Sequence, residues 1–153
     1  MHDSQPMAGT LSLALLDAAG RVVEQRRVHN LVTDAGRNFV ARLFAGKQVG
    51  TLQATLVVGT GDAPPSPADT ALARPVDAAD VGEQHITVTG ARVTLSERLG
   101  EREANQPLRE AGIALAIAGG PPVLYNRVVF DVVNKAPNMQ MTLTWSVDFG
   151  GGR

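Results

Sequence analysis

Residues 33–45 form the one segment of this chain whose apolar residues recur at the spacing of an α-helix. The predicted apolar face of this helix consists of Ala35, Phe39, Val40, Leu43 and Phe44. Thr33 can cap the start of the helix, and Gly46 can take the left-handed conformation that often follows a helix end. Because the other segments have the patterns of strands, turns and loops, the sequence predicts a mainly β fold with a single helix.

Alternating apolar and polar residues, together with β-branched composition, indicate about seven or eight short strands. Their expected bounds are 10–17, 22–28, 52–58, 84–89, 92–98, 108–117, 123–133 and 139–149. The last segment has the most regular period of two, which is typical of a strand with one buried face. We therefore predict an antiparallel β-sandwich, with the helix beside it or across an open end. The predicted core includes Phe39, Leu43, Leu143, Trp145 and Val147.

Local irregularities in the pattern predict where strands bend or stop. The alternation slips near Arg127, which predicts a β-bulge there. Gly90 separates two strand-like segments, which form either one continuous bulged strand or a tight pair. Residues 70–73 can form a short helical turn, and Asp77 and Asp80 indicate another loop.

The length of 153 residues is that of one ordinary domain with one core. We expect a polar leader at residues 1–8, a single domain at residues 9–149 and a flexible, glycine-rich end at residues 150–153. The N-terminal residues lack the basic and apolar regions of a signal peptide, and no apolar run is long enough to span a bilayer. A soluble protein made in the cytoplasm, with no membrane insertion, is the expectation.

Composition narrows the classes of partner and of chemistry. The formal net charge is −1, so there is no overall electrostatic attraction for nucleic acid or an anionic membrane. The absence of cysteine excludes disulfides, thiolate metal sites and cysteine nucleophiles. Aromatic residues make up only 4% of the chain, so platforms for stacking sugars or bases are scarce.

No set of residues has the pattern of a catalytic site. His29 and His85 are the only histidines beyond the leader, and neither has a second potential ligand or a nucleophile at a suitable spacing. No paired carboxylates can be placed opposite each other. We therefore predict that the chain is not an enzyme, has no small-molecule substrate and uses no cofactor.

Two further patterns are closer to ordinary loops than to ligand sites. Residues 59–61, Gly-Thr-Gly, follow a strand as a phosphate-binding loop would, but no Gly-Lys-Ser/Thr follows, so a plain turn is favoured. The four aspartates between residues 62 and 80 do not have the spacing of a calcium loop. We predict no metal site. Arg109 and Glu110 are read as solvated residues or, alternatively, as an interface ion pair.

The segment from Gly61 to Leu72 contains three prolines in four residues and cannot be regular helix or central strand. Such a loop is expected to be stiff and exposed. Docking a stiff loop on a neighbour loses less conformational entropy than docking a flexible one, so we predict an assembly contact. The residues assigned to it are Gly61, Asp62, Pro64, Pro65, Pro67, Asp69 and Leu72.

Five motifs, in their order and spacing, resemble those of small structural proteins of bacteriophage tails and tail-like particles. They are His-Asn-Leu-Val-Thr-Asp-Ala-Gly at 29–36, Leu-Val-Val-Gly-Thr-Gly at 56–61, Pro-Ser-Pro-Ala-Asp-Thr-Ala-Leu at 65–72, Arg-Glu-Ala-Gly-Ile at 109–113, and Thr-Leu-Thr-Trp-Ser-Val-Asp-Phe at 142–149. The resemblance extends over about residues 22–149. It implies a β-rich structural component of a baseplate, collar or fibre attachment, and no active site.

From this resemblance we expect a protein made in the bacterial cytoplasm and then built into a virion or a contractile injection particle. Its expected partners are copies of itself and other tail or baseplate proteins, arranged in a symmetric ring. Val88 and Val123 are candidates for contacts between copies, although core positions are equally open to them. The alternative is a receptor- or glycan-binding module of the same kind of particle.

Overall fold

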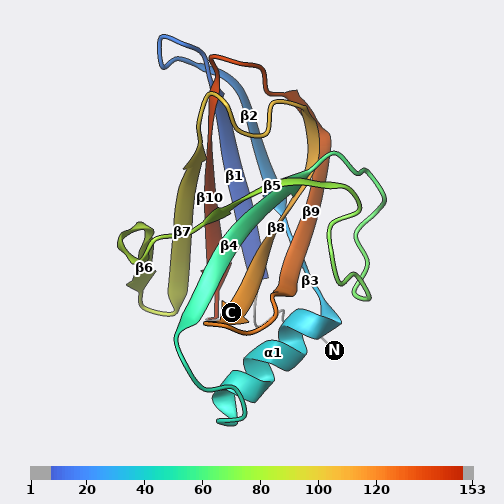
Figure 1. Cartoon of the computed structure of the whole chain (residues 1–153), viewed down its shortest axis with the longest axis vertical. Coiled ribbons are helices and arrows are strands. Elements are labelled where there is room, and N and C mark those ends of the chain that lie inside the picture. The colour runs from blue at the N-terminus through green and yellow to red at the C-terminus, as the bar shows by residue number, and fades with distance from the viewer. Residues whose placement is uncertain (1–7, 150–153) are drawn as a thin grey trace.

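Two five-stranded antiparallel sheets face each other in the computed structural model, which describes residues 8–149 (Figure 1). The first sheet, sheet A, has the strand order β2-β1-β10-β7-β6, and the second, sheet B, has the order β3-β9-β8-β4-β5. The strands are β1 Ala8–Leu16, β2 Val22–His29, β3 Leu31–Val32, β4 Leu52–Gly59, β5 Pro75–Asp80, β6 Ile86–Thr89, β7 Arg92–Leu99, β8 Pro107–Ile117, β9 Val123–Asn134 and β10 Gln140–Asp148. The predicted β-sandwich is confirmed.

The number of strands was underestimated, because ten are present among the described residues instead of seven or eight. The two additional strands, β3 and β5, both lie at the edges of sheet B. The interpretation of Asp77 and Asp80 as a loop was wrong, since both belong to β5. An edge strand tolerates a proline at its first position and solvent-facing acids, so its sequence resembles a loop.

The segment around Gly90 forms a tight pair, the second of the two arrangements left open by the sequence. Strands β6 and β7 pair antiparallel, and Gly90 takes a positive φ of 60° in the turn between them. The strand begins later than predicted, because residues Glu83–His85 form a short 3₁₀-helix. Residues 70–73 form no helical turn, so that prediction was also wrong.

The irregularity predicted near Arg127 is centred two residues earlier. Ile113 pairs with Asn126, but the next residue of β8, Ala114, pairs with Leu124, so Tyr125 is the extra residue of a bulge. Side chains change face on passing a bulge, and five consecutive residues of β9, from Leu124 to Val128, are therefore buried.

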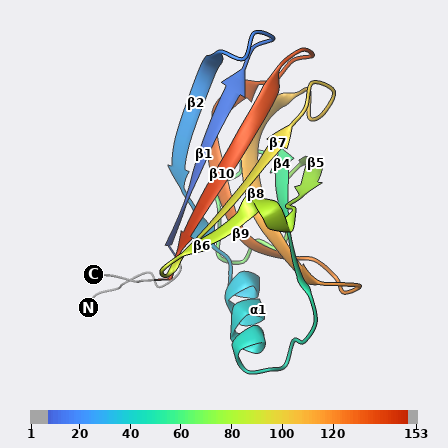
Figure 2. The same ribbon diagram turned by 90° about the vertical axis from the view of Figure 1, so that its left-hand side faces the viewer.

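The helix α1, Asp34–Phe44, lies across one end of the sandwich (Figure 2). Its predicted ends are confirmed: the Thr33 hydroxyl oxygen accepts a hydrogen bond from the N–H of Gly36, and Gly46 has a φ of 74°. Gly36 is needed for close packing, because a Cβ there would lie 2.5 Å from the carbonyl oxygen of Tyr125 in β9. Glycine is a poor helix former, but at position 36 it allows the helix to pack closely on sheet B.

Four of the five predicted core residues are buried: Phe39, Leu143, Trp145 and Val147. The fifth, Leu43, is half-buried, and Phe44 is 95% exposed. The apolar face predicted for α1 is therefore covered over its first two turns, while its last turn projects past the sheets (Figure 1). The core prediction for Leu43 and the prediction that Phe44 lies on the covered face of α1 are thus corrected. Leu43 is partly, and Phe44 almost fully, in contact with solvent.

The predicted leader and C-terminal end lie largely outside the described residues. Ala8, assigned to the leader, is the first residue of β1 and pairs with Asp148 of β10. Within residues 8–149, no helix has the length and apolar character needed to cross a membrane.

Candidate interaction surface

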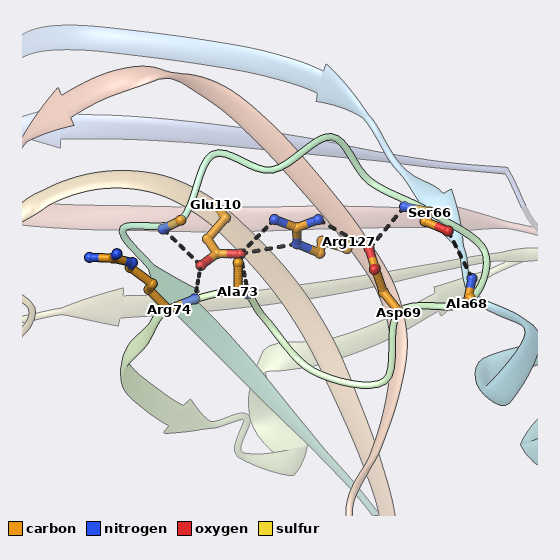
Figure 3. Close-up of polar contacts among 8 residues, drawn as sticks. Ser66, Ala68, Asp69, Ala73, Arg74, Glu110 and Arg127 are labelled. Atoms are coloured by element: carbon orange, nitrogen blue, oxygen red, sulfur yellow. Dashed lines mark hydrogen bonds and ion pairs between the residues drawn. The ribbon is translucent and has the colours of Figure 1, made fainter.

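The Pro-rich segment is a strap, residues 60–74, that is fastened to the outer face of sheet B (Figure 3). Its two ends are joined by a hydrogen bond from the N–H of Thr60 to the carbonyl oxygen of Arg74. The carboxylate of Glu110 in β8 accepts hydrogen bonds from the N–H groups of Gly61, Ala73 and Arg74 at 2.7–2.9 Å. One fully buried carboxylate therefore holds both ends of the strap.

Arg127 of β9 connects this carboxylate to the middle of the strap. Its Nε donates to Glu110 Oε1 at 3.0 Å, and its Nη2 lies 2.9 Å from the same oxygen. Its Nη1 donates to Asp69 Oδ2 at 3.0 Å, and the same Asp69 oxygen accepts from the N–H of Ser66. Because Glu110 is 0% and Arg127 only 2% exposed, the charges are compensated almost entirely inside the protein.

These contacts correct one interpretation of the sequence and add to another. Glu110 is not part of an interface ion pair with Arg109, because it is buried and paired with Arg127. The Gly-Thr-Gly turn does direct a backbone N–H at an anion, but the anion is the chain's own Glu110 carboxylate. The pairing of residues 110 and 127 depends on the register of β8 and β9, so no local pattern could have indicated it.

The predicted assembly residues fall into two groups within the strap. Asp62, Pro64, Pro65 and Pro67 are exposed, whereas Gly61 and Leu72 are buried and Asp69 is half-buried. Leu72 lies over Gly112, at a distance of 3.5 Å from a Cβ placed there. Only the exposed group can contact another protein. The buried and half-buried residues hold the strap on sheet B.

A second polar cluster links β10 to the start of α1. The Nε1–H of Trp145 donates to Asn30 Oδ1 at 2.8 Å, and Asn126 Nδ2 donates to the same oxygen at 3.1 Å. Asn126 in turn accepts from the N–H of Ile113. The indole of Trp145 is 0% exposed, so this cluster belongs to the interior and offers no ligand platform.

The histidines and acids lie in separate surface contacts. The hydroxyl oxygen of Thr10 and His29 Nδ1 are 3.1 Å apart, and His85 Nδ1 lies 3.1 Å from a carboxylate oxygen of Glu97. Burial acts to raise the pKa of Glu97, but hydrogen bonds from His85 and from the N–H of Arg98 outweigh it and lower that pKa. Among the described residues, no three His, Asp or Glu side chains are grouped closely enough to hold a metal ion.

Lys135 is a buried charge that directly follows β9. The last residues of β9 lie at the end of the sandwich opposite α1 (Figure 1). The Nζ of Lys135 donates to the carbonyl oxygen of Gly100 and to Asn105 Oδ1, both at 2.7 Å. Burial lowers the pKa of Lys135, against the opposing effect of nearby carboxylates such as that of Glu103. These bonds fasten the loop between β7 and β8.

At the α1 end, the two sheets and the helix leave an apolar groove of about 240 Å³ that is open to solvent. Strands of both sheets, α1 and the residue after β10 contribute to it. Its lining side chains are Val40, Leu43, Leu52, Ala54, Ile86, Val93, Leu95, Ile113, Leu115, Tyr125, Val147 and Phe149. Sheet B and sheet A supply opposite walls, and α1 covers the end only in part.

Exposed apolar side chains continue from this groove onto the surface. Phe44 ends α1, Val49 lies in the connection to β4, and Leu52 and Phe149 line the groove while remaining about half exposed. Val88 of β6 is 69% exposed and pairs with the lining residue Val93, so it shares the inner face of sheet A. We call these five residues, Phe44, Val49, Leu52, Val88 and Phe149, the α1-end patch.

Comparisons with protein-family models, with curated proteins and with solved structures returned no match to this chain. The likeness to tail proteins therefore stands on the sequence motifs alone.

Val88 is part of the exposed patch, whereas Val123, the other interface candidate, is half-buried in β9.

Proposed function

We propose that this chain is a structural subunit of a bacteriophage tail or a related contractile injection particle, present in several copies and built into a ring, baseplate or fibre attachment. In this proposal the subunit is not an enzyme, and its partners are copies of itself and other tail or baseplate proteins. It is made in the bacterial cytoplasm and then becomes part of the virion or particle.

The observation that carries the proposal is the α1-end patch. Large apolar side chains that gather on the surface of a soluble protein commonly mark a contact with another protein. Phe44 is 95% and Val49 80% exposed, and both belong to the segment between Leu43 and Leu52, two residues that line the apolar groove. Burying these side chains against a neighbour removes apolar surface from water, which stabilises an assembly.

The exposed part of the strap supplies a second contact in the same proposal. Asp62, Pro64, Pro65 and Pro67 are presented to solvent on the outer face of sheet B, away from the groove. Because Glu110 and Asp69 already fix the strap, little conformational entropy remains to be lost on docking. Two different surfaces on one subunit allow a heterologous contact, which closes into a ring by rotation.

The alternative, a receptor- or glycan-binding module, has one supporting feature. The outer face of sheet A is polar and hollowed, with Ser12, Thr142 and Thr144 beside the longer side chain of Arg27. Sugars usually stack on exposed aromatic rings, however, and the two exposed aromatic residues, Phe44 and Phe149, belong to the α1-end patch. We therefore favour assembly over glycan binding.

Replacement of Phe44 by aspartate tests the proposal. A charge at the centre of an apolar contact should weaken association by roughly 30-fold or more, because hot-spot residues in well-packed contacts are worth about 2 kcal/mol or more. Sedimentation velocity over rising concentration should show larger species for the wild type and a monomer for Phe44→Asp. Circular dichroism should show the same fold for both, since Phe44 is 95% exposed.

Val22→Asp is the matched control, because Val22 is also an exposed apolar residue but is the first residue of β2. Strand β2 begins at the end of the sandwich opposite α1 (Figure 1). This variant should assemble as the wild type does. Equal assembly of a folded Phe44→Asp variant would contradict the role of the α1-end patch.

A further inference from the structure

Of the four edge strands within residues 8–149, β6 alone has neither charged residues nor proline (Figure 1). Sheet edges are commonly protected against pairing with another chain by charged side chains, by proline or by a very short strand. Strand β2 carries three charged residues, β5 begins with Pro75 and contains two aspartates, and β3 has only two residues. Strand β6 has the sequence Ile-Thr-Val-Thr, so all four of its residues are uncharged and β-branched.

The backbone of Val88 in β6 faces away from the sheet. Phe149 donates its N–H to the carbonyl oxygen of Ala91, just before β7, so the alternate residue Val147 also directs its backbone groups at β7. Val147 pairs with Val93, whose backbone groups therefore point to β10, and those of its other neighbour, Val88, point outward. The N–H and C=O of Val88 meet no other strand of the described chain, and its side chain is 69% exposed.

We propose that β6 pairs antiparallel with β6 of a second copy, with Val88 opposite Val88 across a two-fold axis, so that sheet A continues from one copy into the other. An extended backbone is the partner that the outward N–H and C=O groups of an edge strand fit. Because β6 carries no charge, two copies of it can face each other without repulsion. This contact rests on the proposed assembly of copies: Val88 belongs to the α1-end patch, and β6 of a neighbour is the surface that covers it.

The short 3₁₀-helix before β6 fixes the register of this pairing. Antiparallel hydrogen bonds join residues whose backbone groups both point to the partner strand, and in β6 these are Ile86 and Val88. The N–H of Ile86 already donates to the carbonyl oxygen of Glu83. A pair of Val88 with Ile86 of the other copy would therefore lack one of its two hydrogen bonds, whereas Val88 opposite Val88 makes both. The two Val88 side chains then cover each other.

The β6 contact joins copies in pairs, and it exists beside the heterologous contact that closes a ring. With only four residues, β6 supplies few hydrogen bonds, each of modest net strength. The pairing should therefore form between copies that the other contacts already hold close together, where the effective concentration is high.

Charged substitutions at position 88 test the two-fold contact. Like charges that face each other across the axis should shift the association of Val88→Lys, and of Val88→Glu, to about tenfold higher concentration or more in sedimentation velocity. An equal mixture of the two variants should recover association, because opposite charges then face each other. Both variants should keep the fold, since the Val88 side chain is largely exposed. Val23→Lys is the matched control and should associate as the wild type does, because Val23 is an exposed valine in β2, the other edge strand of sheet A.

Amide hydrogen exchange reports the backbone pairing itself. The N–H of Val88 should exchange about three- to tenfold more slowly at concentrations where the wild type associates than in the dilute monomer, because it gains a hydrogen bond. The N–H of Thr87, which faces its pairing partner Thr94 in β7, should be protected at both concentrations.

The β6 contact is overturned if Val88→Lys associates as the wild type does, if the mixture of the two charged variants stays dissociated, or if the exchange of the Val88 N–H is independent of concentration. Normal association of the Val88 variants together with a monomeric Phe44→Asp variant would overturn this contact and leave the proposed function standing. A wild-type chain that stays monomeric at every concentration contradicts both.

Discussion

Tyr125 shows how the position of one residue fixes its chemistry. It is the extra residue of the β9 bulge, which turns its ring toward the interior, and the N-terminal turn of α1 packs on its backbone. The same burial that leaves its hydroxyl without a protein partner raises its pKa to about 12 from 10.0. The bulge therefore buries the side chain, and the burial raises its pKa.

Because the pKa of Tyr125 is higher in the folded chain, the unfolded chain loses its proton first as the pH rises. Its contribution to stability is complete below pH 10 and is lost between pH 10 and about pH 12. The loss amounts to about 2–3 kcal/mol, since one pKa unit corresponds to about 1.4 kcal/mol. Urea denaturation should show this loss in the wild type and not in Tyr125→Phe.

The same titration can be followed directly, because the chain contains one tyrosine. Tyrosinate absorbance should rise with a midpoint near pH 12 in the folded protein and near pH 10 in urea. A midpoint near pH 10, in a sample whose circular dichroism is still that of the folded chain, would show that Tyr125 is solvated.

At the scale of elements, the strap shows how an irregular segment is held without regular secondary structure. Three of its backbone N–H groups donate hydrogen bonds to the Glu110 carboxylate. The negative charge of this carboxylate is compensated by the Arg127 guanidinium. Burying these charges costs desolvation energy, which the hydrogen bonds and the ion pair offset. The strap is thus part of the fold on its inner side and available for contacts on its outer side.

Glu110→Ala should destabilise the fold by about 3–5 kcal/mol, because it leaves a buried arginine charge without its main partner and three N–H groups without an acceptor. Glu83→Ala removes an exposed carboxylate and should change the free energy of unfolding by less than about 0.5 kcal/mol. Urea denaturation of both variants provides the measurement. Equal midpoints would mean that the strap is not held by Glu110.

The elements predicted well are those whose signal is local. The alternation around Trp145 and the caps of α1 at Thr33 and Gly46 were sufficient to identify β10 and the helix. Strand β5 was missed because an edge strand carries the acids and the proline of a loop. The Glu110–Arg127 pair and the groove depend on how distant segments meet, which the sequence pattern does not contain.

For the whole molecule, the two ends of the sandwich differ. At one end the loop between β7 and β8 is fastened to Lys135, while the other end is covered in part by α1 and exposes the α1-end patch. Phe44 was assigned to the covered face of the helix because periodicity shows which side of a helix is apolar and not how far the sheet extends beneath it. An incompletely covered apolar end is expected of a subunit that is completed by its neighbours.

The proposed assembly is tested most directly by electron microscopy of the native particle that contains this chain. The proposal predicts a closed ring or collar of repeated copies, with the α1-end patch and the exposed prolines of the strap at the boundaries between subunits. A dispersed monomer with no particle partner, or a ring in which Phe44 faces solvent, would contradict it.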